Sequence, residues 1–118
     1  MANPVMHFEL VARNPDKLKD FYARLFGWRR EEFPDMGYAM LHTDSGQGIG
    51  GGVGGADNSL TPGLAVYVQV PDVEKAMAKA RELGATKVLQ EPNDIPGIGR
   101  FAVFSDPEGN RIGLWKLP

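Results

Sequence analysis

A histidine and a glutamate lie two positions apart near the start of the sequence, in the segment Val5–Ala12. The segment alternates in polarity and is predicted to be a β-strand, so His7 and Glu9 share one face with their Cβ atoms about 7 Å apart. A carboxylate at that distance could raise the pKa of the imidazole or help it orient a bound molecule. Alternatively, Glu9 pairs with Arg111 and neutralises a polar surface.

A second group of residues suited to binding chemistry lies near the end of the sequence, in Gly99–Lys116. Two apolar runs there flank turn-forming residues at 106–110, a pattern typical of a β-hairpin. Alternation in the second strand puts Arg111, Gly113 and Trp115 on one face. A cation and an indole on the same face suit a molecule that has both an anionic group and a planar portion.

The elements predicted to position these residues occur twice in the same order. Each half begins with an alternating strand, Val5–Ala12 or Leu64–Val70, followed by Pro-Asp, an amphipathic helix and a helix-ending glycine. The predicted helices are Pro15–Phe26 and Val73–Leu83, and the later strands are 28–33, 38–42 and 46–55 in the first half and 87–90, 101–104 and 112–115 in the second. This repetition indicates two similar modules.

Two stretches interrupt the regular pattern. Gly50, Gly52 and Gly55 in the glycine-rich segment 46–55 have the spacing GxGxxG, but no helical pattern follows to hold a pyrophosphate. The glycines instead favour a strand whose backbone is closely approached by another group. The segment Glu91–Gly99 contains two prolines and two glycines and is predicted to be a long loop of the kind that forms functional lids.

The composition limits the class of protein. A chain of 118 residues, 42% hydrophobic and 24% charged, has the size and character of one globular domain, and its net charge of -2 gives no footprint for nucleic acid. It has no cysteine, no apolar run of the roughly 20 residues that span a bilayer, and no signal-peptide pattern. These features predict a cytoplasmic protein without nucleic-acid or membrane partners.

Four stretches together resemble the vicinal oxygen chelate superfamily, also called the glyoxalase, bleomycin resistance and extradiol dioxygenase superfamily. They are HFEL at 7–10, FYARLFGW at 21–28, VQVPDVEKAMAKARELGA at 68–85 and GRFAVFSDPEGNRIGLW at 99–115. The chain looks most like small predicted enzymes related to lactoylglutathione lyase. The resemblance implies an α+β fold in a single domain over 1–118, with βαβββ modules at about 4–57 and 62–118. Their strands would curl into a half-open barrel, or cup, with the helices outside, and a homodimer is expected.

The resemblance also implies four metal-ligand positions, one on the first and one on the last strand of each module. His7 matches the first position, whereas Gly50–Gly52, Leu64 or Ala65, and Gly113 stand at the other three. One imidazole alone does not hold a divalent ion against water. We therefore expect no metal cofactor.

A rearranged metal site is the alternative. His42 ends a neighbouring predicted strand, and with His7 and Glu9 it would supply three nitrogen and oxygen donors, enough for zinc or iron. Otherwise His42 is a solvent-facing residue at a strand end.

The faces opposite the helix-packing apolar residues are predicted to line the cup. The candidate catalytic residues are His7 and Glu9, and the candidate ligand-binding residues are Trp28, Tyr67, Gln69, Arg111 and Trp115. The leading hypothesis is that the cup binds a small organic molecule without a metal. The alternatives are a glyoxalase-like lyase or isomerase that uses His7 and Glu9, and a drug-sequestering protein of the bleomycin-binding type.

Overall fold

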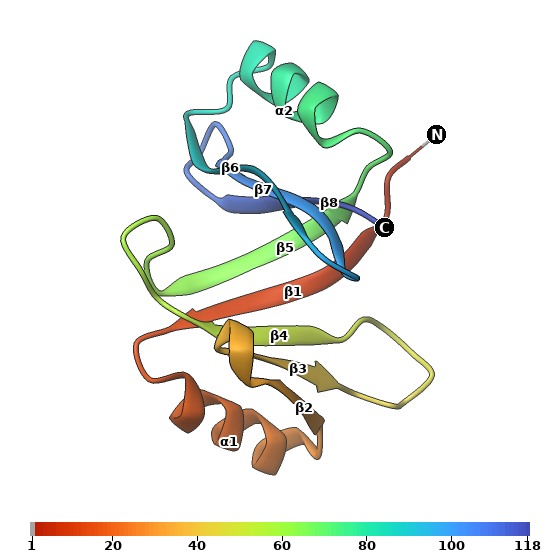
Figure 1. The fold of residues 1–118 in the computed structure, drawn as a ribbon, viewed down its shortest axis with the longest axis vertical. Helices are drawn as coiled ribbons and strands as arrows, with labels where there is room; N and C mark the ends of the chain where they lie inside the picture. Colours follow the sequence, from red (N-terminus) through yellow and green to blue (C-terminus); the bar gives the residue numbers. More distant parts are fainter. Residues whose placement is uncertain (1) are drawn as a thin grey trace. The chain divides into compact units, whose positions relative to one another are not determined.

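The computed structural model describes residues 2–118 (Figure 1). The chain divides into two compact units, one of residues His7–Leu64 and one of residues Ala65–Pro118 with the first residues of the chain through Met6. Each unit is built on one βαβββ sequence of elements. The predicted α+β class and the duplication of the module are therefore confirmed.

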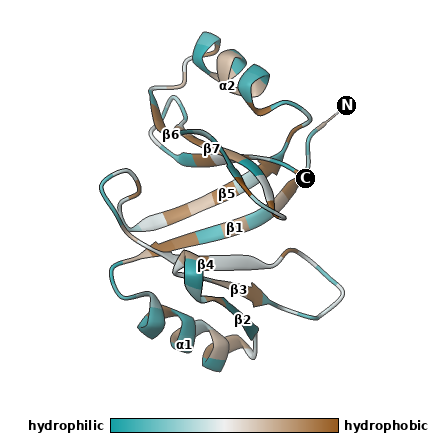
Figure 2. Cartoon of the chain, viewed as in Figure 1, coloured by the Kyte–Doolittle hydropathy of each residue, from teal (hydrophilic) through white to brown (hydrophobic). Residues whose placement is uncertain are grey.

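The N-terminal unit contains one helix and four strands. Its elements are β1 (Val5–Ala12), α1 (Pro15–Phe26), β2 (Arg29–Phe33), a short 3-10 turn η1 (Pro34–Met36), β3 (Tyr38–His42) and β4 (Gly51–Gly55). The strand order is β2-β3-β4-β1, in which β1 runs parallel to β4 and the other neighbours are antiparallel. Strand β1 alternates in hydropathy, whereas β4 is mostly pale because four of its five residues are glycine (Figure 2).

Helix α1 begins and ends at the predicted residues. The Asn14 side chain accepts a hydrogen bond from the Lys17 backbone N–H at 3.2 Å, and Gly27 ends the helix in the left-handed conformation. Leu18 and Tyr22 pack on the buried core of Ala12, Leu41 and Val53. The predicted apolar stripe is only partly covered, since the other members Phe21, Leu25 and Phe26 are more than half exposed.

The C-terminal unit repeats this plan. Its elements are β5 (Gly63–Gln69), α2 (Val73–Glu82), β6 (Lys87–Ile95), β7 (Gly99–Ser105) and β8 (Arg111–Lys116). The strand order is β5-β8-β7-β6, with β5 parallel to β8 and the remaining pairs antiparallel. Helix α2 covers a core of Val70, Val73, Met77, Ala102 and Leu114. Among the described residues, neither helix is long and apolar enough to cross a membrane.

The two Pro-Asp pairs serve different purposes, contrary to the equivalence expected from the sequence. Pro15 is the first residue of α1, after the cap Asn14. In the second module Asp72 itself is the cap and accepts a hydrogen bond from the Lys75 N–H at 2.9 Å, so Pro71 precedes the helix. The repeat is therefore offset at the helix start.

The predicted long loop at Glu91–Gly99 is wrong. Strand β6 continues through this segment to Ile95 and pairs with β7, and the Ile98 N–H closes a tight turn on the Ile95 carbonyl at 3.0 Å. Two register shifts in the β6–β7 ladder absorb the irregularity near Pro92, which a regular ladder would exclude. The segment is thus a β-hairpin instead of a free lid.

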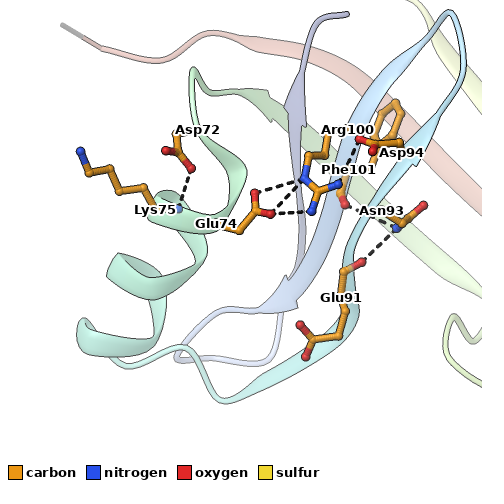
Figure 3. A network of polar contacts seen from close by, with 8 residues as sticks. All are labelled: Asp72, Glu74, Lys75, Glu91, Asn93, Asp94, Arg100 and Phe101. Carbon is orange, nitrogen blue, oxygen red and sulfur yellow. Dashed lines mark hydrogen bonds and ion pairs between the residues drawn. The ribbon is translucent and has the colours of Figure 1, made fainter.

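Arg100 ties this hairpin to helix α2 (Figure 3). Its guanidinium donates to both carboxylate oxygens of Glu74, on α2, and forms an ion pair with Asp94, on β6, at 3.0 Å. Hydrogen bonding to Glu74 raises the pKa of Arg100, and hydrogen bonding to Arg100 lowers the pKa of Glu74. The network links three elements of the C-terminal unit on the helix side of its sheet.

Candidate functional site

The glycines of β4 lie beneath aromatic rings. A Cβ atom on Gly51 would overlap the Phe8 ring, and on the other face of the strand a Cβ atom on Gly52 would overlap the Tyr38 hydroxyl. A Cβ atom on Gly54 would stand 3.0 Å from Cδ1 of Tyr38. Another group therefore does approach the backbone of this strand closely, as the glycines predict. The strand itself covers Gly51–Gly55 and is shorter than the predicted strand at 46–55.

Tyr38 crosses β4 to reach His7. Strands β3 and β1 flank β4 on opposite sides, and the Tyr38 hydroxyl oxygen lies 2.8 Å from Nε2 of His7. Only a strand without side chains at Gly52 and Gly54 leaves room for the ring. Sequence analysis missed Tyr38 as a partner of His7, although the glycine spacing was a signal that a neighbouring side chain would fill the space.

The environment of His7 differs from the one expected beside a carboxylate. Burial lowers the pKa of His7 to about 4, because the charged imidazolium loses hydration. The net shift is opposite in direction to the increase that a nearby carboxylate could have produced. Glu9 is half-buried on the same strand, opposite Gly52 in the ladder. The imidazole is therefore neutral at neutral pH and suits a hydrogen-bonding or proton-accepting role.

His42 lies at the end of β3 with its own partner. Its Nε2 is 2.7 Å from Oε1 of Glu31, and its side chain is 30% exposed. Within residues 2–118, no three His, Cys, Asp or Glu side chains are placed to hold a metal ion together, and this includes His7, Glu9 and His42.

The C-terminal unit carries an aromatic cluster formed by Tyr67, Phe101 and Trp115. The Tyr67 ring lies over Gly113 and meets Phe101 edge-on, with centroids 5.8 Å apart. The Phe101 and Trp115 rings are nearly parallel at 5.8 Å, and the Trp115 indole N–H donates to the Ile98 carbonyl at 3.1 Å. Sequence analysis missed Phe101, although the register of the predicted hairpin sets it opposite Trp115.

Gln69 and Arg111 extend the face that holds this cluster. Gln69 pairs with Trp115 across the β5–β8 ladder, and Arg111 lies on β8 opposite Ser105 of β7. Both side chains are half-buried, whereas Tyr67 is almost fully buried, with 4% of its surface exposed. Tyr67, Gln69, Arg111 and Trp115 therefore share one face of the C-terminal unit, as their strand positions predict.

Trp28 lies apart from the His7 face of its unit. It packs on Phe26 and Tyr22 of α1 at centroid distances of 4.9 and 5.9 Å, and on Phe8 at 5.7 Å. Phe8 alternates with His7 on β1, so Trp28 belongs to the helix-covered side of the sheet. The sequence pattern did not reveal this, because Trp28 precedes β2 and the alternation of side chains along a strand does not assign it to a face.

The residues present do not fit the four-ligand metal site that the resemblance implies. Of the four positions, only His7 carries a ligating side chain. Tyr38 lies on Gly52, Tyr67 lies on Gly113, and Ala65 is a buried apolar residue. Donors for a divalent ion are thus missing at three positions, and aromatic rings fill the space at two of them.

Two βαβββ modules, each with its helix packed on one face of its strands, are the architecture of a glyoxalase-like protein. The sequence profile of the Glyoxalase/Bleomycin resistance protein/Dioxygenase superfamily matches residues 5–114. The chain belongs to this superfamily.

Similar proteins agree with this assignment. "Putative glyoxylase CFP32" of Mycobacterium tuberculosis is 34% identical over 115 residues, which cover 92% of this chain and 42% of that protein. "Anthracycline biosynthesis protein DnrV" of Streptomyces peucetius is 28% identical over 125 residues, with 92% and 45% covered. The chain spans less than half the length of both relatives.

A solved structure has the same fold. The crystal structure of a glyoxalase/bleomycin resistance protein/dioxygenase superfamily member from Vibrio splendidus superposes with a TM-score of 0.67. It is 19% identical, with 98% of this chain and 99% of that chain covered.

Proposed function

We propose that this chain binds a small organic molecule without the metal of its metal-dependent relatives. The observation that carries the proposal is the placement of Tyr38 on Gly52 and Tyr67 on Gly113, where the resemblance would place metal ligands. At each of these two positions a glycine stands where a metal ligand is expected, and the ring of a tyrosine from a neighbouring strand covers that glycine. Recognition then depends on apolar contact and hydrogen bonding.

The C-terminal unit suits a ligand with a planar part and an anionic group. Phe101 and Trp115 present neighbouring rings, and Arg111 lies four residues from Trp115 on the same strand face, about 13 Å along the strand. A guanidinium binds a carboxylate or phosphate through charge-assisted hydrogen bonds, and Gln69 adds an amide. The name of the Streptomyces relative supports including polycyclic aromatic acids among the ligands tested.

Calorimetric titration with anthraquinone-2-carboxylate tests this proposal, and uncharged anthraquinone is the comparison ligand. Arg111→Gln is expected to weaken carboxylate binding about tenfold or more, because one charge-assisted contact is lost. Arg100→Gln is the matched control, since Arg100 bonds to Glu74 on the helix side of the sheet. Equal affinities for the Arg111 and Arg100 variants, or for the two ligands, would contradict the proposal.

The glyoxalase-like lyase or isomerase remains the second candidate, and the half-buried neutral imidazole of His7 favours it. Turnover of a bound ligand that disappears in His7→Ala would support the enzyme. Tight binding without turnover that survives His7→Ala would support sequestration of the bleomycin-binding type.

We further propose that the chain forms a homodimer in the cytoplasm. The dimer follows from the resemblance, and the cytoplasmic location suits a chain without cysteine. Sedimentation equilibrium of the purified chain and fractionation of expressing cells would test these two points.

A further inference from the structure

Helix α1 borders a hollow that the proposed function does not use. The hollow has a volume of about 330 Å³ and is lined by Ala12, Asn14, Lys17, Leu18 and Phe21, all of the N-terminal unit. Residues 14, 17, 18 and 21 recur at helical spacing and share one face of α1, while Ala12 ends β1. A volume of this order is typical of small-molecule sites.

The walls of the hollow are apolar. Ala12 is buried, Leu18 is half-buried, and Phe21 is 54% exposed. The Phe21 ring meets the Tyr22 ring edge-on, with centroids 5.0 Å apart, so a neighbouring side chain of the same helix supports it. Hydrocarbon that covers such a wall is removed from water together with the wall, which favours binding of an apolar chain.

A positive charge stands on the rim of the hollow. Within residues 2–118, the Lys17 side chain has no ion-pair partner. The other charged side chains of α1 pair with one another, since Nζ of Lys19 lies 3.5 Å from Asp16 and Nη1 of Arg24 lies 3.5 Å from Asp20. The positive end of the helix dipole lies at the same end of α1 as Lys17. The rim therefore favours an anionic group.

The second module does not repeat the apolar wall. Its helix α2 is capped by Asp72 in the way that Asn14 caps α1. Counted from the two caps, Lys75 corresponds to Lys17. The position of Phe21, however, is taken by a lysine of α2 at residue 79. The combination of an apolar wall and a lysine is thus specific to α1, and Lys75 provides a matched control.

We propose that this hollow binds a monocarboxylate with an aliphatic chain, such as the anion of a medium-chain fatty acid. The chain lies on the apolar wall, and the carboxylate meets the Lys17 ammonium through a charge-assisted hydrogen bond. The site belongs to the N-terminal unit, so the inference does not rest on the proposed function of the C-terminal unit.

Nuclear magnetic resonance titration of the unmodified chain tests the site, with acetate, butanoate, hexanoate and octanoate as probes. Octanoate is expected to shift the backbone amide signals of Lys17, Leu18 and Phe21 in a saturable way. Affinity should rise roughly two- to fourfold for each CH2 group added, because the wall covers part or all of each group.

Two pairs of variants separate the apolar and the charged contact. Phe21→Ala is expected to weaken octanoate binding roughly three- to tenfold. Phe26→Ala is its control, since Phe26 is 56% exposed on the same helix but packs on Trp28 outside the hollow. Lys17→Gln is expected to weaken binding roughly two- to fivefold, as for an exposed ion pair, and Lys75→Gln should leave it unchanged. The backbone amide spectrum of each variant establishes that it is folded.

Three results would overturn the proposal: no octanoate-dependent shift of the α1 signals, acetate binding as tightly as octanoate, or Phe21→Ala or Lys17→Gln binding octanoate as tightly as its control.

A second copy of the chain is the competing occupant of the hollow. Sedimentation velocity should give the same mass with and without saturating octanoate. A dimer that octanoate dissociates would show that the second copy fills the hollow, and this result would also overturn the proposal.

Discussion

The ring of Tyr67 lies directly on the backbone of Gly113, its neighbour in the parallel β5–β8 ladder. Because Gly113 has no side chain, the ring extends over β8 and meets the edge of Phe101 on β7. One glycine thus allows an aromatic contact between two strands that are not adjacent. The same residue is the position at which the sequence resemblance expects a metal-binding carboxylate.

Substitution of Gly113 by alanine is expected to destabilise the fold by about 1–3 kcal/mol. The new Cβ would overlap Cδ2 and Cε2 of Tyr67, which is almost fully buried. Urea unfolding monitored by circular dichroism measures the change in free energy of unfolding.

Gly55→Ala is the control for that substitution, because its Cβ would lie at an ordinary 3.9 Å from Cγ of Pro15. The double variant Tyr67→Ala/Gly113→Ala should lose less stability than the sum of the two single variants. Additive losses would show that the ring does not constrain position 113.

Alanine at Gly52 is expected to destabilise more than alanine at Gly54. The first Cβ would overlap the Tyr38 hydroxyl and carbon ring atoms, whereas the second would stand 3.0 Å from Cδ1. The Gly52 variant should also move the His7 ring signals in a magnetic resonance spectrum, because the Tyr38 hydroxyl must shift. Unchanged His7 signals would contradict the placement of Tyr38.

Stability is expected to fall on acidification through a contribution from His7. Burial lowers the pKa of His7 from 6.5 to about 4, so between these pH values the unfolded chain binds more protons than the folded chain. The free energy of unfolding should therefore fall as the pH is lowered from 6.5 to about 4, and His7 accounts for at most roughly 3 kcal/mol of this decrease. Above pH 6.5 the contribution of His7 to stability is fully present.

The measurement compares the pH dependence of the free energy of unfolding for the unmodified chain and for His7→Gln. The carboxylates contribute equally in both proteins, so their contribution cancels in the difference. His42→Gln should keep the decrease in stability that His7 causes on acidification. Parallel profiles for the unmodified chain and His7→Gln would show that His7 does not titrate abnormally.

Removal of the Asp106 carboxylate is expected to destabilise the β7–β8 turn, because the backbone N–H groups that it accepts lose their partner. Its Oδ1 accepts the backbone N–H groups of Asn110 at 2.8 Å and Glu108 at 2.9 Å, which close the β7–β8 turn and lower the pKa of Asp106. Asp106→Ala should lower the thermal midpoint, whereas Glu108→Ala should leave it nearly unchanged. Equal midpoints for the two variants would disprove this role.

Metal removal is expected to leave the protein unchanged. Extensive dialysis against a chelator should alter neither the thermal midpoint nor the affinity for anthraquinone-2-carboxylate, because three of the four expected ligand positions lack donors. Elemental analysis before dialysis provides the comparison. A stoichiometric metal whose removal abolishes ligand binding would contradict the proposed function.

The sequence by itself determined the module and its duplication. Asn14 and Gly27 set the limits of α1 through local hydrogen bonding and backbone conformation, and the turn at Asp106 set the β7–β8 hairpin. These features depend on residues close together in the chain. The alternation of side chains along β8 likewise placed Arg111 and Trp115 on one face. The glycines of β4 also showed that something must approach their backbone.

Only the tertiary structure decided what approaches those glycines. The partnership of Tyr38 with His7 depends on the order of β3, β4 and β1, and Trp28 was assigned to the helix side by its contacts with Tyr22 and Phe8. The continuation of β6 past Pro92 likewise needs the bulged ladder with β7. Such outcomes follow from contacts between residues distant in the sequence, which local propensity and spacing do not encode.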